Sequence, residues 1–153
     1  HSCLLRPKSL GEVTLASADP FADPLIDPKF LSHPDDMKDM IDGYKIMMKV
    51  LGSEPFSKYI SDHSQRPIDI NNDADIEQAM REGADTVYHP VGTCKMGNDD
   101  MSVVNNRLKV HNMNNLRVVD ASIMPTLVGG NTNAPTIMIG EKASDMIIED
   151  WNI

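Results

Sequence analysis

One histidine lies in a stretch whose neighbours would hold its backbone in a fixed position. Residues 88–97 read Tyr-His-Pro-Val-Gly-Thr-Cys-Lys-Met-Gly, with His89 directly before Pro90. Proline disfavours helical geometry in the residue before it and has no N–H, while Gly92 and Gly97 permit backbone conformations that other residues avoid. Histidine exchanges protons near neutral pH, and a general base needs a rigid mount. The stretch indicates a proton-transfer site, with a hydrogen-bonded structural histidine as the alternative.

Residues 116–136 form a second stretch whose residue types could bind or react with a ligand, and it begins with a predicted strand. Val118 and Val119 suit a buried strand, and Asp120 and Ser122 can bond nearby backbone donors. The two glycines that follow in the loop allow the main chain to approach another group closely.

The same stretch ends where a helix is predicted to start. Pro135 is a natural first-turn residue, and apolar residues continue at helical spacing: Ile137, Ile139, Ala143, Met146 and Ile147. Free amides between residues 132 and 136 would point outward with partial positive charge. Such a helix start is a ready anion site.

Other elements must position these two stretches. Residues 10–17 alternate apolar with polar side chains, which predicts a half-buried strand in an antiparallel sheet. Residues 19–34 contain four prolines and favour an extended loop. Residues 107–110 predict another short strand. With the helices, these patterns predict an α+β fold.

Two further helices are expected upstream of His89. Ser32 is the predicted cap of the first, Gly52 ends it, and its apolar stripe comprises Met37, Met40, Ile41, Tyr44, Met47, Met48 and Leu51. Asn72 begins the second, which stops at Gly83 and leads the chain towards His89.

Composition narrows the class of partner. The chain has 153 residues, of which 14 are Lys or Arg and 23 are Asp or Glu, so its formal charge is −9. This charge argues against binding to nucleic acid. Cys3 and Cys94 are too few for a disulfide framework and fit a reducing compartment. No apolar run approaches the length of a membrane-spanning helix, and no secretory signal is visible.

Three motifs in order resemble one family. Residues 89–97 read His-Pro-Val-Gly-Thr-Cys-Lys-Met-Gly, residues 118–125 read Val-Val-Asp-Ala-Ser-Ile-Met-Pro, and residues 131–136 read Asn-Thr-Asn-Ala-Pro-Thr. With residues 5–9 and 19–28, they resemble the carboxy-terminal part of a glucose-methanol-choline (GMC) oxidoreductase. Choline dehydrogenases and related bacterial alcohol dehydrogenases are the most similar members, since the second polar position is an asparagine.

The resemblance implies an FAD enzyme that oxidises a choline-like or other primary alcohol to the aldehyde. His89 would take the hydroxyl proton while hydride passes to the flavin, and Asn131 would hydrogen-bond the alcohol or alkoxide oxygen. Positions that match the family's cofactor-binding segments are Asp120, Ala121, Ser122, Thr132, Asn133 and Ala134.

One departure from the family concerns the rest of the cofactor site. The chain has no Gly-x-Gly-x-x-Gly fingerprint, which binds the pyrophosphate of a dinucleotide. We therefore expect a carboxy-terminal fragment that needs the amino-terminal FAD-binding part of its own chain and is inactive alone. Residues 1–115 would belong to the substrate-binding domain, and residues 116–153 would supply the last strand and helix of the FAD-binding domain.

Several questions stay open at this stage. The expected location is the cytoplasm, either free or peripheral on the inner membrane, because reduced flavin could pass electrons to oxygen or to a membrane quinone. The non-enzymatic alternative is a catalytically silent interaction domain. A hydrolase built on Cys94 and His89 lacks a nucleophile elbow and a third orienting group. A zinc site lacks closely spaced ligands.

Overall fold

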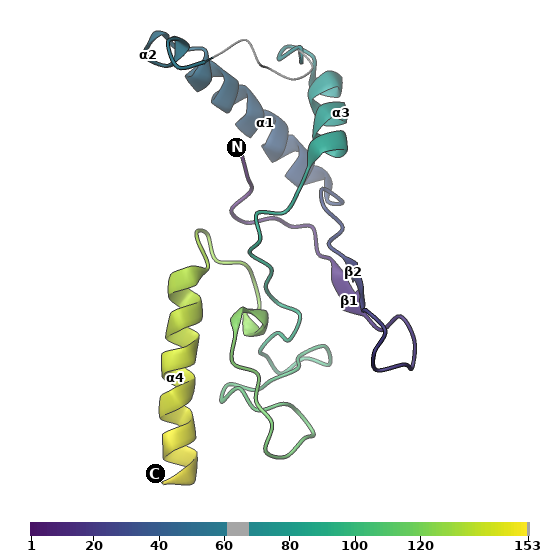
Figure 1. Cartoon of the computed structure of the whole chain (residues 1–153), viewed down its shortest axis with the longest axis vertical. Coiled ribbons are helices and arrows are strands. Elements are labelled where there is room, and N and C mark those ends of the chain that lie inside the picture. Colours follow the sequence, from purple (N-terminus) through teal and green to yellow (C-terminus); the bar gives the residue numbers. More distant parts are fainter. Residues whose placement is uncertain (61–67, 153) are drawn as a thin grey trace. The chain divides into compact units, whose positions relative to one another are not determined.

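The computed structural model describes residues 1–60 and 68–152. It contains helices and a two-stranded antiparallel sheet (Figure 1), so the α+β prediction is confirmed at this level. Residues 1–87 form one compact unit and residues 88–153 another. In the described part of the chain, no helix has both the length and the apolar character needed to cross a membrane.

The sheet of the first unit is a small hairpin. Strand β1 (Glu12–Thr14) pairs antiparallel with strand β2 (Leu25–Asp27), and Val13 lies opposite Ile26. All residues of both strands are exposed. The hairpin therefore adds no buried face to the core of this unit.

Two predictions about this hairpin were wrong. The strand expected at residues 10–17 is shorter and is not half-buried. The proline-rich segment is not wholly loop, because Pro24 and Pro28 flank a stretch whose own amides remain free to pair. A side chain at position 11 would clash with the facing segment, since a Cβ on Gly11 would lie 2.3 Å from the carbonyl oxygen of Asp27.

Helix α1 (Pro34–Leu51) was predicted with the wrong cap. His33, rather than Ser32, is the N-cap, and its Nδ1 accepts a hydrogen bond of 3.2 Å from the amide of Asp35. The reason is local geometry, because His33 has the extended backbone that an N-cap requires, with φ −87° and ψ 131°. The predicted end is confirmed, as Gly52 follows the last helical residue.

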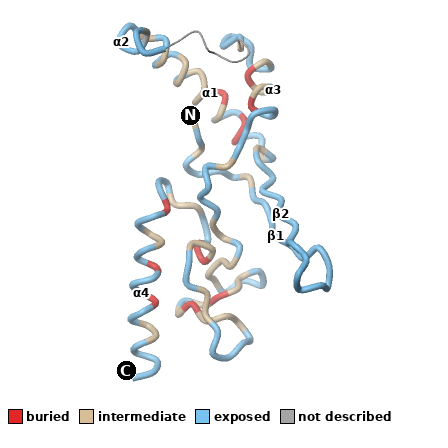
Figure 2. Tube along the Cα trace, viewed as in Figure 1, coloured by how far each residue is buried: buried red, intermediate tan, exposed pale blue. Residues whose placement is uncertain are grey.

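Helix α3 (Asp73–Gly83) begins and ends as predicted. The side-chain oxygen of Asn72 accepts a hydrogen bond of 3.1 Å from the amide of Ala74. A short helix α2 (Glu54–Ser57) precedes it and was not predicted. The core of this unit lies between α1 and α3, whose buried turns are red in Figure 2, and consists of Met37, Ile41, Ile76 and Met80.

The second unit contains isolated β-bridges where strands were predicted. Val104 bridges Val110, and Lys109 bridges Arg117. The expected strand at residues 107–110 is interrupted because Leu108 has a left-handed φ of 60°, which extended structure does not accommodate. This prediction was wrong.

The strand predicted around Val118 and Val119 is also absent from the described residues. The amide of Val118 donates to the carbonyl oxygen of Leu108 over 3.2 Å, and Val119 is exposed. Among the described residues the segment lacks the partners on both edges that a buried strand requires.

Two helical elements complete the second unit. They are the 3₁₀ turn η1 (Ala121–Ile123) and helix α4 (Asn133–Trp151). The predicted helix is therefore confirmed, with Pro135 in its first turn. Its buried side chains Ile139 and Ala143 share one core with Val104, Leu108, Ile123 and Met124.

Candidate functional site

The backbone around His89 is constrained on both sides. Tyr88 has a φ of 62°, which is unfavourable for a large residue with a Cβ. Such outliers cluster at functional sites. On the other side Pro90 fixes its own φ, and the His89 side chain itself is exposed. The segment thus presents an accessible imidazole from a restrained backbone.

Gly92 brings the His89 segment against the second motif. Its φ is 87°, and a Cβ there would lie 3.4 Å from the carbonyl oxygen of Met124. Further along, Met96 packs against the core that contains Met124. The glycine predicted to need unusual backbone freedom therefore does need it.

Backbone hydrogen bonds join these two motifs. The amide of Cys94 donates to the carbonyl oxygen of Ser122 over 3.0 Å, and the amide of Met96 donates to that of Ile123 over 2.8 Å. Asp120 caps η1, because its Oδ1 accepts from the amide of Ser122 over 2.7 Å. The predicted pairing of Asp120 with a nearby backbone donor is thus confirmed.

The third motif forms the start of α4. Thr132 is its N-cap and is buried, with 8% of its surface exposed. Its carbonyl oxygen accepts from the amide of Thr136 over 3.0 Å and from the Thr136 hydroxyl over 2.7 Å. The Thr132 side chain makes no capping hydrogen bond to the first amides of α4, and both Asn133 and Ala134 are exposed.

Backbone hydrogen bonds join the His89 and Asp120 segments, but among the described residues no hydrogen bond joins the two side chains predicted to act on the alcohol. His89 and Asn131 belong to the same compact unit, and both are exposed. Helix α4 contacts η1, so the start of α4 and the Asp120 segment share one scaffold.

The carboxyl group of Asp99, just after the His89 segment, has a lowered pKa. Hydrogen bonds from Lys95, from the Ser102 hydroxyl and from the amide of Met101 lower the pKa of Asp99 to about 2. Lys95 Nζ lies 2.9 Å from Asp99 Oδ1. This pair closes the turn that follows residues 89–97.

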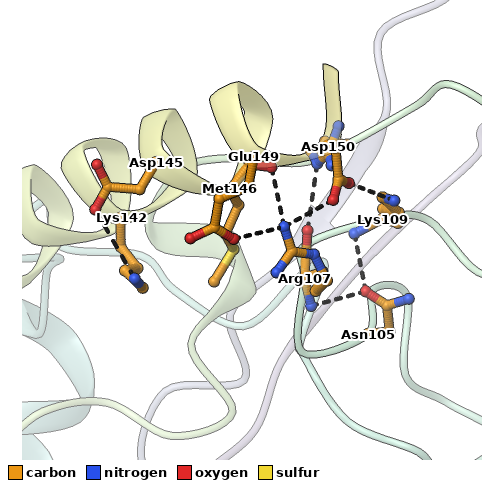
Figure 3. A network of polar contacts seen from close by, with 9 residues as sticks. Asn105, Arg107, Lys109, Lys142, Asp145, Met146, Glu149 and Asp150 are labelled. Atoms are coloured by element: carbon orange, nitrogen blue, oxygen red, sulfur yellow. Dashed lines mark hydrogen bonds and ion pairs between the residues drawn. The ribbon is translucent and has the colours of Figure 1, made fainter. Parts of the chain in front are cut away.

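Sequence reasoning missed a charged cluster at the other end of α4. Arg107 and Lys109 pair with Asp150 (Figure 3), and Arg117 pairs with the same carboxylate. Hydrogen bonding to Lys109 and the nearby cations lower the pKa of Asp150. Asp150 is far from its three partners in the sequence. The only local signal for this cluster was the alternation of basic residues at 107 and 109.

The rival constellations gain no geometric support. Cys3 and Cys94 are both free. Within residues 1–60 and 68–152, no group of three His, Cys, Asp or Glu side chains could hold a metal ion. Over the same ranges, no hydrogen bond joins Cys94 to His89.

Comparison with known proteins identifies relatives of this arrangement. The chain is 49% identical over 148 residues to an alcohol dehydrogenase (acceptor) of Pseudomonas putida, a match that covers 97% of this chain and 27% of the relative. It is 42% identical over 147 residues to an oxygen-dependent choline dehydrogenase of Klebsiella pneumoniae, covering 96% of this chain and 26% of the relative. A solved formate oxidase from Aspergillus oryzae RIB40 superposes with a TM-score of 0.89 at 33% identity, covering 96% of this chain and 26% of that one.

These matches confirm the resemblance seen in the three motifs. The chain spans about a quarter of the length of these relatives. Residues 7–140 match the carboxy-terminal family model described as GMC oxidoreductase. The chain therefore belongs to the GMC oxidoreductase family.

Proposed function

We propose that this chain is the carboxy-terminal part of an FAD-dependent dehydrogenase that oxidises a choline-like or other primary alcohol to the aldehyde. The names of the alcohol and choline dehydrogenases that it resembles support the reaction class. The formate oxidase structure, whose description concerns FAD modification, supports the cofactor. The amino-terminal part of the same protein would supply the rest of the FAD site.

The domain division is part of the same proposal. Residues 1–115 would complete the substrate-binding domain, and residues 116–153 would complete the FAD-binding domain. The compact units seen here divide at residue 87 instead, but that division reflects contacts within this chain alone. The proposed division depends instead on the contacts that residues 1–115 and 116–153 would make with the remaining part of the protein.

The residues at the start of α4 fit a flavin. The Thr132 side chain makes no capping hydrogen bond, and Asn133 and Ala134 are exposed. The amides of these two residues would therefore donate to an anionic atom. Asp120 and Ser122, held in η1 by their own hydrogen bond, would bind the phosphate and ribityl region together with Ala121. FAD, when bound, supplies the hydride acceptor. Thr132, Asn133 and Ala134 would lie against its ring.

His89 and Asn131 would act on the alcohol oxygen from this scaffold. The exposed imidazole of His89 would remove the hydroxyl proton as a general base. The Asn131 amide would donate a hydrogen bond to the same oxygen as negative charge develops on it. The observation that carries this assignment is the pair of backbone bonds from Cys94 and Met96 to η1, because they fix the His89 segment to the segment proposed to hold the cofactor.

The proposal extends to partners and location. The partners are a small alcohol and the remaining part of the same polypeptide, with no role for nucleic acid. The protein would work in the cytoplasm, and it would be peripheral on the inner membrane where its electron acceptor is a quinone. Oxygen as acceptor would require no such contact.

Anaerobic stopped-flow reduction of the flavin in the full-length protein tests the catalytic assignment. We expect His89→Ala to lower the reduction rate by roughly 10² to 10⁴. Asn131→Ala should cost roughly 2 to 4 kcal/mol of activation free energy. Because both side chains would act on one oxygen, the double variant should lose less than the product of the single losses.

A matched histidine serves as the control. His33→Asn retains an N-cap for α1 and should leave the reduction rate unchanged. Normal reduction in His89→Ala, with flavin content unchanged, would return His89 to a structural role. A full-length protein that binds no flavin would instead favour the silent interaction domain.

A further inference from the structure

The carboxy-terminal end of α4 is held by cations from another segment. Arg107 Nη2 donates to Asp150 Oδ1 over 2.7 Å and to Glu149 Oε2 over 3.1 Å (Figure 3). Lys109 and Arg117 both pair with the other carboxylate oxygen of Asp150. Asp150 and Arg117 are the most shielded members, with 22% and 14% of their side chains exposed. The Asp150 carboxylate thus pairs with three cationic side chains.

This arrangement opposes the intrinsic electrostatics of the helix. The last turn of α4 has no basic residue, and its acidic residues lie at the negative end of the helix dipole, which is unfavourable. Arg107 offsets this cost by also donating to the carbonyl oxygen of Met146 over 3.0 Å. The helix end is therefore completed by tertiary contacts, and α4 depends on them for its attachment there.

The segment that carries the cations is bonded to the His89 segment. The amide of Val103 donates to the carbonyl oxygen of Lys95 over 2.9 Å, and the amide of His111 donates to that of Val103 over 2.9 Å. At the opposite end of α4, the N-cap Thr132 directly follows Asn131. The charged cluster consequently links the segment that bears His89 to the helix that bears Asn131.

From this connection we infer that Asp150 is a positioning residue, which anchors α4 so that Asn131 keeps its place relative to His89. The inference rests on the proposed function of those two residues. Asp150 itself touches neither substrate nor cofactor. Its role is exerted through the orientation of α4.

Helix α4 is long enough that a small tilt about its buried middle would displace Asn131. Ile139 and Ala143 are buried at the middle of α4, with 6% and 1% of their surface exposed, and form the natural pivot. At 1.5 Å per residue, the start of α4 lies about 12 Å from that pivot. A tilt of about 5° would therefore move Asn131 by about 1 Å, a displacement that can cost up to a hundredfold in rate.

A double-mutant cycle in the full-length, flavin-loaded protein tests the inference. We expect Asp150→Asn to lower the anaerobic flavin-reduction rate by roughly tenfold. In an Asn131→Ala background the same change should have little further effect, because the side chain that it positions is gone. Sites this far apart are otherwise additive, so a purely structural role would give the product of the two losses.

Asp145→Asn provides a matched control on the same helix. Asp145 pairs with Lys142, and both side chains are more than half exposed, at 66% and 57%. This variant removes the same charge and should leave the reduction rate unchanged. Asp150→Glu, which keeps the charge, should recover most of the rate lost in Asp150→Asn.

The outcomes separate this inference from the function on which it rests. Unchanged reduction in Asn131→Ala would overturn the proposed role of Asn131, and the inference with it. A loss in Asn131→Ala that is additive with Asp150→Asn would overturn the positioning role alone. If Asp150→Asn does not yield a folded holoenzyme, Lys109→Met removes one cation of three and should give the same non-additivity with a loss of roughly threefold.

Discussion

Replacement of Asp36 by asparagine should release the amino-terminal segment from α1. Asp36 is buried in the first turn of that helix, with 3% of its surface exposed. Its carboxylate accepts from the amide of Lys8 at 2.9 Å, and from the amide and hydroxyl of Ser9 at 2.7 and 2.6 Å. The same segment is also tied to the start of α1 by the exposed pair of Lys8 with Asp35 and by a hydrogen bond of 3.0 Å from the amide of the N-cap His33 to the Ser9 hydroxyl.

The size of the effect follows from these three donors. A hydrogen bond to a charged group contributes about 1 kcal/mol more than one to a neutral group. Asparagine also places an NH₂ group against one of the donors. Because the site is only partly closed to water, we expect a total cost of about 2–3 kcal/mol in local opening.

Hydrogen exchange in the full-length protein measures this opening directly. The amides of Lys8 and Ser9 should exchange roughly 30- to 150-fold faster in Asp36→Asn. Asp39→Asn is the matched control, since Asp39 is an exposed carboxylate on the same helix. Rates in Asp36→Asn that match the wild type, or equal acceleration in Asp39→Asn, would refute the reasoning.

The pH dependence has a defined sign. Burial raises the pKa of Asp36. Hydrogen bonds from the Ser9 hydroxyl and from the amides of Lys8 and Ser9 together lower this pKa by more than burial raises it, so the net shift is downward. The stabilisation is therefore fully present above the unfolded pKa of about 4, and it is lost as pH falls through the lower folded pKa. Over that interval the protection factors of these two amides, which correct for the pH dependence of the intrinsic exchange rate, should fall in the wild type and not in Asp36→Asn.

Two further predictions concern the segment that follows His89. Gly92→Ala should cost about 1–2 kcal/mol in thermal unfolding, because φ is 87° there; Gly83→Ala, in open space at the end of α3, should be nearly neutral, and equal effects would contradict the strain. The Asp99 carboxyl should titrate at about 2 by NMR, so its small contribution to stability is present above about pH 4 and is lost as pH falls towards 2. Lys95→Met should raise that midpoint, and an unchanged midpoint would mean that the Lys95 hydrogen bond does not set it.

Helices were predictable because their signals are local. The spacing of Met37 and Ile41, the asparagine cap at Asn72 and the prolines in first turns act within a few residues, and all have the expected structural effect. The shift of the α1 cap by one residue, to His33, is the kind of boundary error that such signals allow.

Strands were less predictable because each needs a partner. The alternating pattern at residues 107–110 suited a strand, yet Leu108 turns into a left-handed conformation and is buried at 4% exposure. Burial of that large apolar side chain offsets the cost of its φ. Val118 and Val119 similarly carry a strand-like pattern, without partners on both sides among the described residues. Pattern alone does not specify pairing.

The motifs were recognisable in sequence, whereas the contacts that hold them together were not. The bond from Cys94 to Ser122 and the pairing of Arg107 with Asp150 join residues that are distant along the chain. Such pairs depend on the register of every element between them. Local residue types can therefore identify His89 and Asn131 as candidates for chemistry. Their relative placement depends on the core around Ile139 and on the charges at the far end of α4, so variants at both places bear on the proposed reaction.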